Sequence, residues 1–484
     1  MSNQRKSLCH AFARVSGSAA VIAAAVLGFG NGASAQLAAP TLDMGPAIHD
    51  NGGGTKGEAG ADRALRLLTL APVPPTAANN TAGGMYSFDI SFVDESTQTY
   101  YLADRSNKVV DVVDAKTGTF TKQISATPAF AGFTGNNDTS GPNGVVAAYP
   151  WLFVTDTKTG GGGGGRVVTI DLRSDSTVSD VSTGGTARAD ELAYDPEHGL
   201  LLAINNADSP PFGTLIKVDK STGHLTVGAQ IKFADATNGA EQPVWDPDSN
   251  RFYLSIPEIP PATPPNRNKN GAVKRINPFS ATVEATYPVH DCGPAGLALG
   301  RHQDLFIGCN TVFDTAGNNW KPDGTVPADP RDVIMDAKTG NIDATVFGVG
   351  AGDEVWFNRG DGNYYATGSG SPQRPLEVPQ PTAPAVNNAK GSTPAGVVDS
   401  KDQRLLQLFP TYNVPALLDA SGNQTGPNAH PAGTAHSIAA NARNNLVFVP
   451  LAANNAFISP SDPTKDCLTG CVAVFWHADE DKNK

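Results

Sequence analysis

The stretch AEQPVWDPDSNRFYLSIPE (240–258) contains, in order, a carboxylate, a short apolar segment ending in an aromatic residue, an Asp-Pro turn and a second apolar segment. Two short apolar segments joined by a turn predict a β-hairpin. The same order of residue types returns in six other places: SFDISFVDESTQTYYLAD (87–104), GPNGVVAAYPWLFVTDT (141–157), DELAYDPEHGLLLAINN (190–206), AGLALGRHQDLFIGC (295–309), DEVWFNRGDGNYYATG (353–368) and AHSIAANARNNLVFVPLA (435–452). Repeats spaced by about fifty residues are typical of propellers.

Each repeat divides into four strand-like segments joined by turn residues. The turn at 114–118 reads Asp-Ala-Lys-Thr-Gly, in which Asp caps the turn and Gly supplies a positive φ angle. The seventh repeat lacks its outermost segment, whereas the apolar segment ALRLLTLAPV (64–73) has no partner near it in the sequence. We therefore predict an all-β, seven-bladed β-propeller closed by an N-terminal strand that pairs with 471–477, because closure protects the sheet edges.

The N-terminus predicts export. Three basic residues precede the apolar run SAAVIAAAVLGFG (18–30), and small residues follow up to position 35, which is the pattern of a secretory signal peptide over residues 1–35. We expect a flexible lead-in over 36–61, a single propeller domain over 62–478 and a short tail over 479–484. The expected location is secreted or periplasmic.

The cysteines agree with an oxidising compartment. Four remain after Cys9 is removed with the signal peptide, and an even number in an exported chain favours disulfides over a metal cluster. Cys292 and Cys309 flank a predicted hairpin, and Cys467 and Cys471 flank a tight turn. We predict that each pair forms a local disulfide.

Charge and motifs narrow the classes of partner. Removing residues 1–35 takes away three positive and no negative charges, so the formal charge falls from −12 to −15. An acidic chain is a poor binder of nucleic acid or of an anionic membrane surface, and no segment is apolar for long enough to span a bilayer. The six-glycine run at 160–165 precedes a predicted strand and lacks the Lys-Ser/Thr of a phosphate loop. We expect a monomer with a small-molecule ligand or substrate.

The repeats also predict a site. Aligning them on the end of the first strand places one residue just before that strand in each copy. These residues are Asp89, Asn143, Asp190, Glu241, Ala295, Asp353 and His436, and all except Ala295 have side chains that can act as ligands. In a propeller these positions converge at one end of the central channel. Oxygen ligands in this number suit Ca²⁺, while the alternative is a set of polar residues that only line a wet channel. We expect Glu191 and Glu354 in the wall beside the ring.

Two segments resemble a known enzyme family. AEQPVWDPDSNRFY (240–253) is similar to the Glu-containing strand entry of the senescence-marker-protein/gluconolactonase family, and GPNGVVAAYPWLFVTDT (141–157) resembles its Pro-Asn-Gly entry. That family consists of six-bladed, calcium-dependent lactonases. The resemblance implies metal ligation by Glu241, Asn143 and Asp353, and an Asp that acts as ligand and base.

A second resemblance implies a different function. AHSIAANARNNLVFVPLAANN (435–455) and VVDVVDAKTGTFTKQI (109–124) are similar to YVTN-type seven-bladed repeats of exported bacterial proteins, which mostly serve as binding or surface modules. Two hypotheses therefore stand.

The first is a calcium-dependent lactone or ester hydrolase. In it Asp353 and Asp89 are the candidate catalytic residues, and Glu241, Asn143, Asp190, Asp353 and His436 are the candidate metal ligands. The second is a binding or scaffold propeller without catalysis. A lyase with His436 as base is a third, more distant option.

Overall fold

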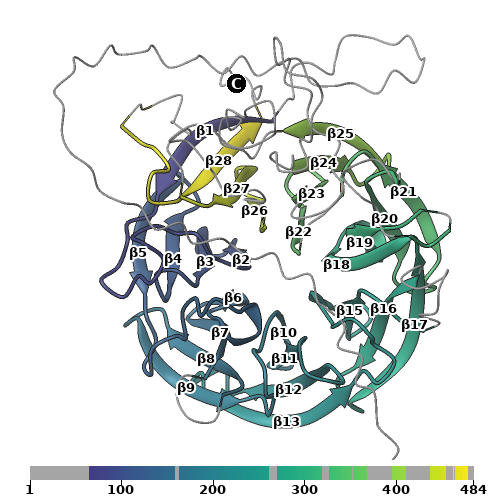
Figure 1. The fold of residues 1–484 in the computed structure, drawn as a ribbon, viewed down its shortest axis with the longest axis horizontal. Coiled ribbons are helices and arrows are strands. Elements are labelled where there is room, and N and C mark those ends of the chain that lie inside the picture. The colour runs from purple at the N-terminus through teal and green to yellow at the C-terminus, as the bar shows by residue number, and fades with distance from the viewer. Residues whose placement is uncertain are drawn as a thin grey trace, which may run out of the picture. The chain divides into compact units, whose positions relative to one another are not determined.

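The computed structural model describes residues 65–158, 163–260, 270–314, 316–318, 326, 328–350, 353–367, 395–409, 436–453, 462 and 464–477. All of them belong to one compact unit that spans 47–484. The strands of this unit form seven four-stranded antiparallel blades around a common axis (Figure 1). The prediction of an all-β, seven-bladed propeller is confirmed.

The first four blades use strands that follow one another in the sequence, from the axis outward. Blade 1 contains β2 (Ser91–Asp94), β3 (Thr99–Asp104), β4 (Val109–Asp114) and β5 (Thr119–Ile124). Blade 2 contains β6 (Val145–Ala148), β7 (Trp151–Thr157), β8 (Gly165–Asp171) and β9 (Ser176–Ser182). Blade 3 contains β10 (Leu192–Asp195), β11 (Leu200–Asn205), β12 (Phe212–Val218) and β13 (Leu225–Lys232). Blade 4 contains β14 (Pro243–Asp246), β15 (Arg251–Ile256), β16 (Asn270–Asn277) and β17 (Thr282–His290).

The last three blades complete the ring. Blade 5 contains β18 (Cys292–Leu299), β19 (Asp304–Val312), β20 (Arg331–Asp336) and β21 (Ile342–Phe347). Blade 6 contains β22 (Val355–Asn358), β23 (Asn363–Thr367), β24 (Ala395–Asp399) and β25 (Arg404–Phe409). Blade 7 contains β26 (Ala439–Asn441), β27 (Leu446–Leu451), β28 (Cys471–His477) and β1 (Leu65–Pro72). One parallel pair, Asn270 with Cys292, joins the sheets of blades 4 and 5.

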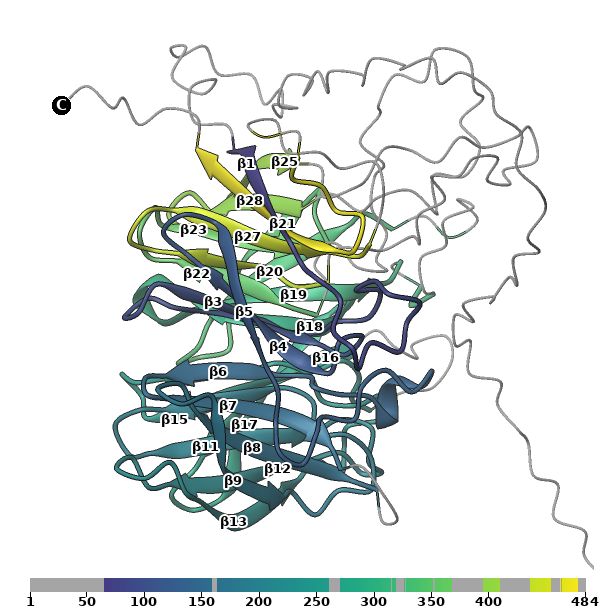
Figure 2. The ribbon, with the colours of Figure 1, turned by 90° about the vertical axis from the view of Figure 1, so that its left-hand side faces the viewer.

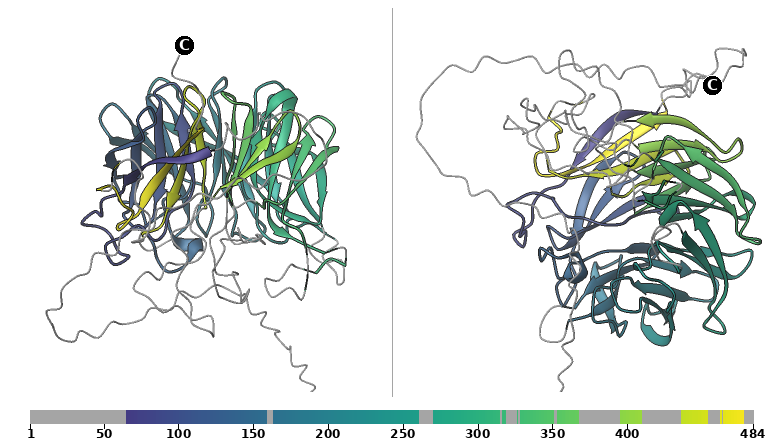
Figure 3. Two further views of the ribbon diagram at one scale, coloured as in Figure 1. Left: turned by 90° about the horizontal axis from the view of Figure 1, so that it is seen from above. Right: turned by 45° about the vertical axis from the view of Figure 1, so that its right-hand side comes forward.

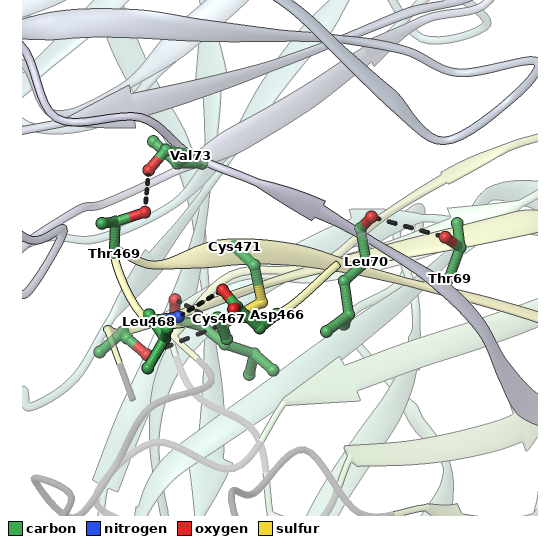
Figure 4. Close-up of a disulfide and its surroundings, with 10 residues drawn as sticks. Thr69, Leu70, Val73, Asp466, Cys467, Leu468, Thr469 and Cys471 are labelled. Carbon is green, nitrogen blue, oxygen red and sulfur yellow. Dashed lines mark hydrogen bonds between the residues drawn. A yellow bond between two sulfur atoms is a disulfide. The ribbon is translucent and has the colours of Figure 1, made fainter. Parts of the chain in front are cut away.

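The N-terminal strand closes the ring as predicted. β1 pairs with β28 in antiparallel register from Leu65 opposite His477 to Pro72 opposite Cys471. Two hydrogen bonds continue the junction past the end of β1. The Val73 N–H donates to the Gly470 carbonyl at 2.8 Å, and the Thr469 hydroxyl donates to the Val73 carbonyl at 2.7 Å, the second of which is drawn in Figure 4.

Both predicted disulfides are present. Cys292 is bonded to Cys309, which lies on the neighbouring strand of blade 5, and Cys467 is bonded to Cys471 at the start of β28 (Figure 4). All four cysteines are fully buried. Each bridge closes a short loop, so each constrains only its own blade.

The turns form for the reason that their residues suggest. The Asp114 carboxylate accepts the N–H of Lys116 at 2.7 Å, and Gly118 has a φ angle of 68°. The turns that begin at Asp219 and Asp336 are built in the same way. These repeated hairpin turns fix the register of each blade.

The cores lie between neighbouring blades. Tyr100 and Val113 of blade 1 pack with Phe448 and Val474 of blade 7, and the rings of Tyr100 and Phe448 stack with centroids 5.2 Å apart. Side views show that the strands run across the thickness of the ring (Figures 2 and 3). Residues at matching places before the inner strands therefore lie at the same end of the channel. Among the described residues the helical elements are two 3₁₀ turns, Asn137–Thr139 and Arg301–Gln303, and none of them contains a helix able to span a membrane.

Candidate functional site

The polar residues that precede the inner strands occupy equivalent positions. The backbone N–H of Asp89 donates to Ala103 at 2.9 Å, and that of Asp190 donates to Ile204 at 2.7 Å. Asn143 and Glu241 each donate in the same way to the second strand of their own blade, at 2.9 Å. Each residue thus adds one backbone hydrogen bond to the hairpin of the first and second strands of its blade. These side chains therefore lie at the same end of the channel.

Two arginines that the sequence analysis missed lie among these residues. Arg105, directly after β3, donates from Nη2 to Asp89 Oδ2 and from Nε to Asn143 Oδ1 at 2.9 Å. Arg188, two residues before Asp190, contacts Asp89 at 3.3 Å and Asp190 at 2.7 Å. We call the set Asp89, Arg105, Arg188, Asp190, Glu241, Asp353 and His436 the mouth cluster.

His436 connects two carboxylates of the mouth cluster. Its Nε2 lies 2.7 Å from Asp89 Oδ1 and 3.1 Å from Asp353 Oδ2. Asn310, on β19, donates to the other oxygen of Asp353 at 2.7 Å. The side chains of His436 and Asp353 are each 26% exposed, whereas that of Asp89 is 4% exposed. Of the two candidate catalytic carboxylates, Asp353 is therefore the one that solvent and ligands can reach.

The other ring positions have mixed roles. The Asn143 amide is used within the protein, because it accepts from Arg105 and donates to the Ala189 carbonyl at 2.7 Å. Glu241 is half-buried. Ala295 lies inside β18 and contributes no polar group.

Neighbouring charges control the pKa values of Asp89 and His436 in the mouth cluster. Burial alone would raise the pKa of Asp89, but the charge of Arg105, the hydrogen bond with His436 and the charge of Arg188 outweigh it and hold that pKa below its usual value. Burial lowers the pKa of His436, yet Asp353 and Asp89 together raise it to about 9. This pKa favours the imidazolium form of His436 at neutral pH.

The pKa values of Asp190 and Glu241, in contrast to that of Asp89, are raised above their usual values. Burial raises the pKa of Asp190 to about 7 against the opposing charge of Arg188. Burial and the charges of Asp190 and Asp353 raise the pKa of Glu241 to about 8. At neutral pH the mouth cluster thus contains three cationic side chains, and its carboxyls are only partly ionised.

This donor set does not fit a calcium site. Calcium takes six to eight oxygen ligands, but the Asp89, Asp190 and Asp353 oxygens already accept from arginine, histidine or asparagine donors. Within the described part of the chain, no three or more His, Cys, Asp or Glu side chains are placed so that they could hold a metal ion. Arg105 and Arg188 supply positive charge beside these carboxyls, and calcium dependence stays a prediction.

Two further acids, Glu191 and Glu354, each follow an acid of the mouth cluster by one residue in the sequence. The Glu354 Oε2 atom accepts from the backbone N–H groups of Ser91 and Ile438, both at 3.2 Å, and from the Ser437 hydroxyl. Glu191 is 3% exposed, and its buried Oε2 atom has no hydrogen-bond partner among the described residues. Burial raises the pKa of Glu354 to about 8, and burial together with neighbouring carboxyls raises that of Glu191 well above its usual value.

Beyond these acids the channel becomes apolar. A cavity of about 460 Å³, which we call the channel cavity, is lined by both acids and by inner-strand side chains that include Leu192, Val244 and Val355. It shares Phe92, Ala147, Leu299, Trp356 and Phe357 with a second cavity of about 440 Å³ at the turns between first and second strands. Glu191 and Glu354, expected in the wall beside the ring, therefore line the channel itself.

The comparisons with known proteins support the fold. No family model matches the chain, and no curated protein matches its sequence. The chain is similar to the solved structure of Kuenenia stuttgartiensis hydrazine synthase, with 11% sequence identity, a TM-score of 0.51 and coverage of 79% of this chain and 98% of that chain. It is also similar to the Dos1 propeller, with 12% identity, a TM-score of 0.48 and coverage of 84% and 95%. The first likeness supports a propeller and nothing finer, so the resemblances to the gluconolactonase and YVTN families remain predictions.

Proposed function

We propose that this protein is an exported binding propeller that takes a small, largely apolar molecule with a polar head group into its channel cavity. The observation that carries the proposal is the unpartnered, buried carboxyl oxygen of Glu191 at the polar end of that cavity. A buried polar group without a hydrogen bond costs about 1–3 kcal/mol. A ligand that bonds to Glu191 would recover this energy.

The size and lining of the channel cavity support binding of a small molecule. Its volume of about 460 Å³ lies in the range of known ligand sites, which are mostly apolar with a few polar groups. The walls come from inner strands held by the inter-blade cores, so the cavity is formed before the ligand arrives. A preformed site loses little free energy to reorganisation on binding.

Export is part of the proposal. The expected signal peptide over 1–35 and the formal charge of −15 after its removal agree with a secreted or periplasmic protein. The two disulfides agree with an oxidising compartment. A monomer with one axial site is the simplest assembly for such a binder.

A channel-filling substitution tests the proposal. Ala148 is half-buried and lines the channel cavity, whereas Ala229 is exposed on the outermost strand of blade 3. Small apolar molecules with polar heads would be screened by the fluorescence of Trp245 and Trp356, which line the cavity. We expect hits whose affinity falls about tenfold or more in Ala148→Leu and is unchanged in Ala229→Leu. Hits that bind Ala148→Leu as well as wild type would show that the channel is not the site.

Hydrolysis of a lactone or ester at the mouth cluster is the second candidate. It is favoured by Asp353 and His436, whose Oδ2 and Nε2 atoms form an ion pair at 3.1 Å and whose side chains are each 26% exposed. In this hypothesis Asp353 would accept a proton from water, and the His436 imidazolium would donate one to the leaving group. A panel of lactones and aryl esters, assayed with calcium and with chelator, would test it. Turnover that Asp353→Asn leaves unchanged would rule it out.

A further inference from the structure

The charge of the channel cavity indicates which head group it would take. The side chains that line the cavity in the described part of the chain include two carboxyls, Glu191 and Glu354, and no lysine, arginine or histidine. The arginines of the mouth cluster form ion pairs with other acids. Arg105 is paired with Asp89, and Arg188 contacts Asp89 and Asp190. The acids of the cavity therefore have no basic partner in its lining.

The surroundings of Glu191 add to this imbalance. The charged groups that act on it most strongly are Asp190, Glu241, Asp353 and Glu354, all of them carboxyls. Glu354 has hydrogen-bond donors from Ser91 and Ser437, but the Glu191 Oε2 atom has none. Among the described residues, the Glu191 Oε2 atom has no hydrogen-bond donor and the cavity lining beside it has no basic side chain.

The remainder of the lining suits a cation with an apolar body. Trp245, Trp356 and Phe357 contribute aromatic side chains to the lining of the cavity. An ammonium group is attracted to aromatic faces, and its positive charge favours the ionised form of a nearby carboxyl whose pKa burial has raised. The apolar walls would bury an alkyl or aryl chain attached to it.

We propose that the ligand is an organic cation, an amine with an apolar body, whose ammonium group binds Glu191 at the polar end of the channel cavity. This inference rests on the proposed function and specifies its ligand class. Glu354 forms the opposite side of the same pocket, and the aromatic side chains surround the apolar part of the ligand. A neutral or anionic molecule of the same shape binds less tightly, because it leaves the Glu191 oxygen without a charged donor.

Three probes of one shape distinguish the head groups. Phenylbutylammonium, phenylbutanol and phenylbutyrate share an apolar body and differ in charge. We expect titration calorimetry on the wild-type protein to show the ammonium binding about tenfold or more tightly than the alcohol, with the carboxylate weakest. Equal affinity for the ammonium and the alcohol would overturn the cation inference and leave the proposed function standing. Preference for the carboxylate would also overturn it, and would place recognition at the arginines of the mouth cluster.

Matched variants locate the recognition. In Glu191→Gln the ammonium should bind no more tightly than the alcohol, whereas in Glu197→Gln, an exposed acid on the same blade, the preference should persist. Glu354→Gln serves as a second variant, with a smaller loss expected because its carboxyl already has donors. A preference that survives in both Glu191→Gln and Glu354→Gln would contradict the assignment to these acids. Failure of all three probes to bind wild type, together with an empty result in the wider ligand screen, would overturn the proposed function as well.

Discussion

Two carboxyls of the mouth cluster should respond in opposite ways to the same kind of substitution. Asp89 is 3% exposed and bonded to the guanidinium groups of Arg105 and Arg188. Neutralising one partner of a buried ion pair costs about 3–5 kcal/mol, because the other charge stays buried. We therefore expect Asp89→Asn to lower the free energy of unfolding by about 3–5 kcal/mol at neutral pH.

Glu241→Gln should have the reverse effect. The pKa of Glu241 is raised from 4.5 to about 8, so the folded protein holds a proton that the unfolded chain releases across this range. Stability from this proton is complete below pH 4.5 and is lost as the pH rises toward 8. Glutamine does not titrate, so the Glu241→Gln variant does not lose this stability as the pH rises. At one pKa unit per 1.4 kcal/mol, discounted for partial exposure, Glu241→Gln should raise the free energy of unfolding at neutral pH by about 1–3 kcal/mol.

Urea denaturation of both variants and wild type would test the pair. We expect the Glu241→Gln gain to vanish at about pH 4 and to grow up to about pH 8. The Asp89→Asn loss should persist across this range and shrink only in acid, since the pKa of Asp89 lies below its usual value. Equal losses in the two variants would refute the assignment of Arg105 and Arg188 as the counter-charges.

The same experiment tests calcium. A ligand that binds only the folded state stabilises it by mass action, so each curve would be repeated with calcium and with chelator. We expect no calcium effect in wild type. If calcium stabilised wild type, and Glu241→Gln both lowered stability and removed that effect, Glu241 would be a metal ligand and our interpretation of the mouth cluster would be wrong.

Three further predictions concern the scaffold. Leu70→Ala in β1, at a fully buried position, should cost about 2–5 kcal/mol in urea denaturation, while Arg66→Ala, exposed on the same strand, should be nearly neutral; equal effects would contradict closure by β1. Replacing Cys292 and Cys309 by alanine should cost about 2–3 kcal/mol without changing the far-ultraviolet spectrum, and an unchanged melting temperature would show that the bridge adds no stability. Arg166→Met, which leaves two carboxylates of blade 2 without their partner, should cost about 3–5 kcal/mol at neutral pH, less so in acid, and a loss independent of pH would argue against an ionic cause.

The fold could be predicted because its information is local and repeated. Each hairpin carries its own turn residues, such as Asp114 and Gly118, and seven similar hairpins have few ways to bury their faces. The last repeat lacks an outer strand, and the apolar segment at 64–73 has no partner near it in the sequence. Pairing of the two was therefore the consistent prediction, and β1 does pair with β28. The single parallel pair that joins blades 4 and 5 had no such signal, because one bridge depends on the exact path of the chain between the blades.

The site was predicted only in part, because its partners come from different strand positions. Alignment of the inner strands found Asp89, Asp190 and His436, which the structure brings together. Arg105 follows a second strand, and Arg188 lies four residues before its inner strand. An alignment of one position for each repeat cannot find residues that reach the same place from elsewhere.

The charge balance of the ring contained the missing information. Several ionised carboxyls that lie close together in a buried site are stabilised by positive charge nearby. A pattern of acids in the sequence is compatible with either a metal ion or arginine as that charge. Two arginines that flank an acid near the channel are visible in the sequence, at 104–107 (DRSN) and at 187–190 (ARAD). Once these arginines neutralise Asp89 and Asp190, the next acid along the channel, Glu191, is the one left without a partner. The counter-charge that is absent from the protein at this point is what a bound ligand would provide.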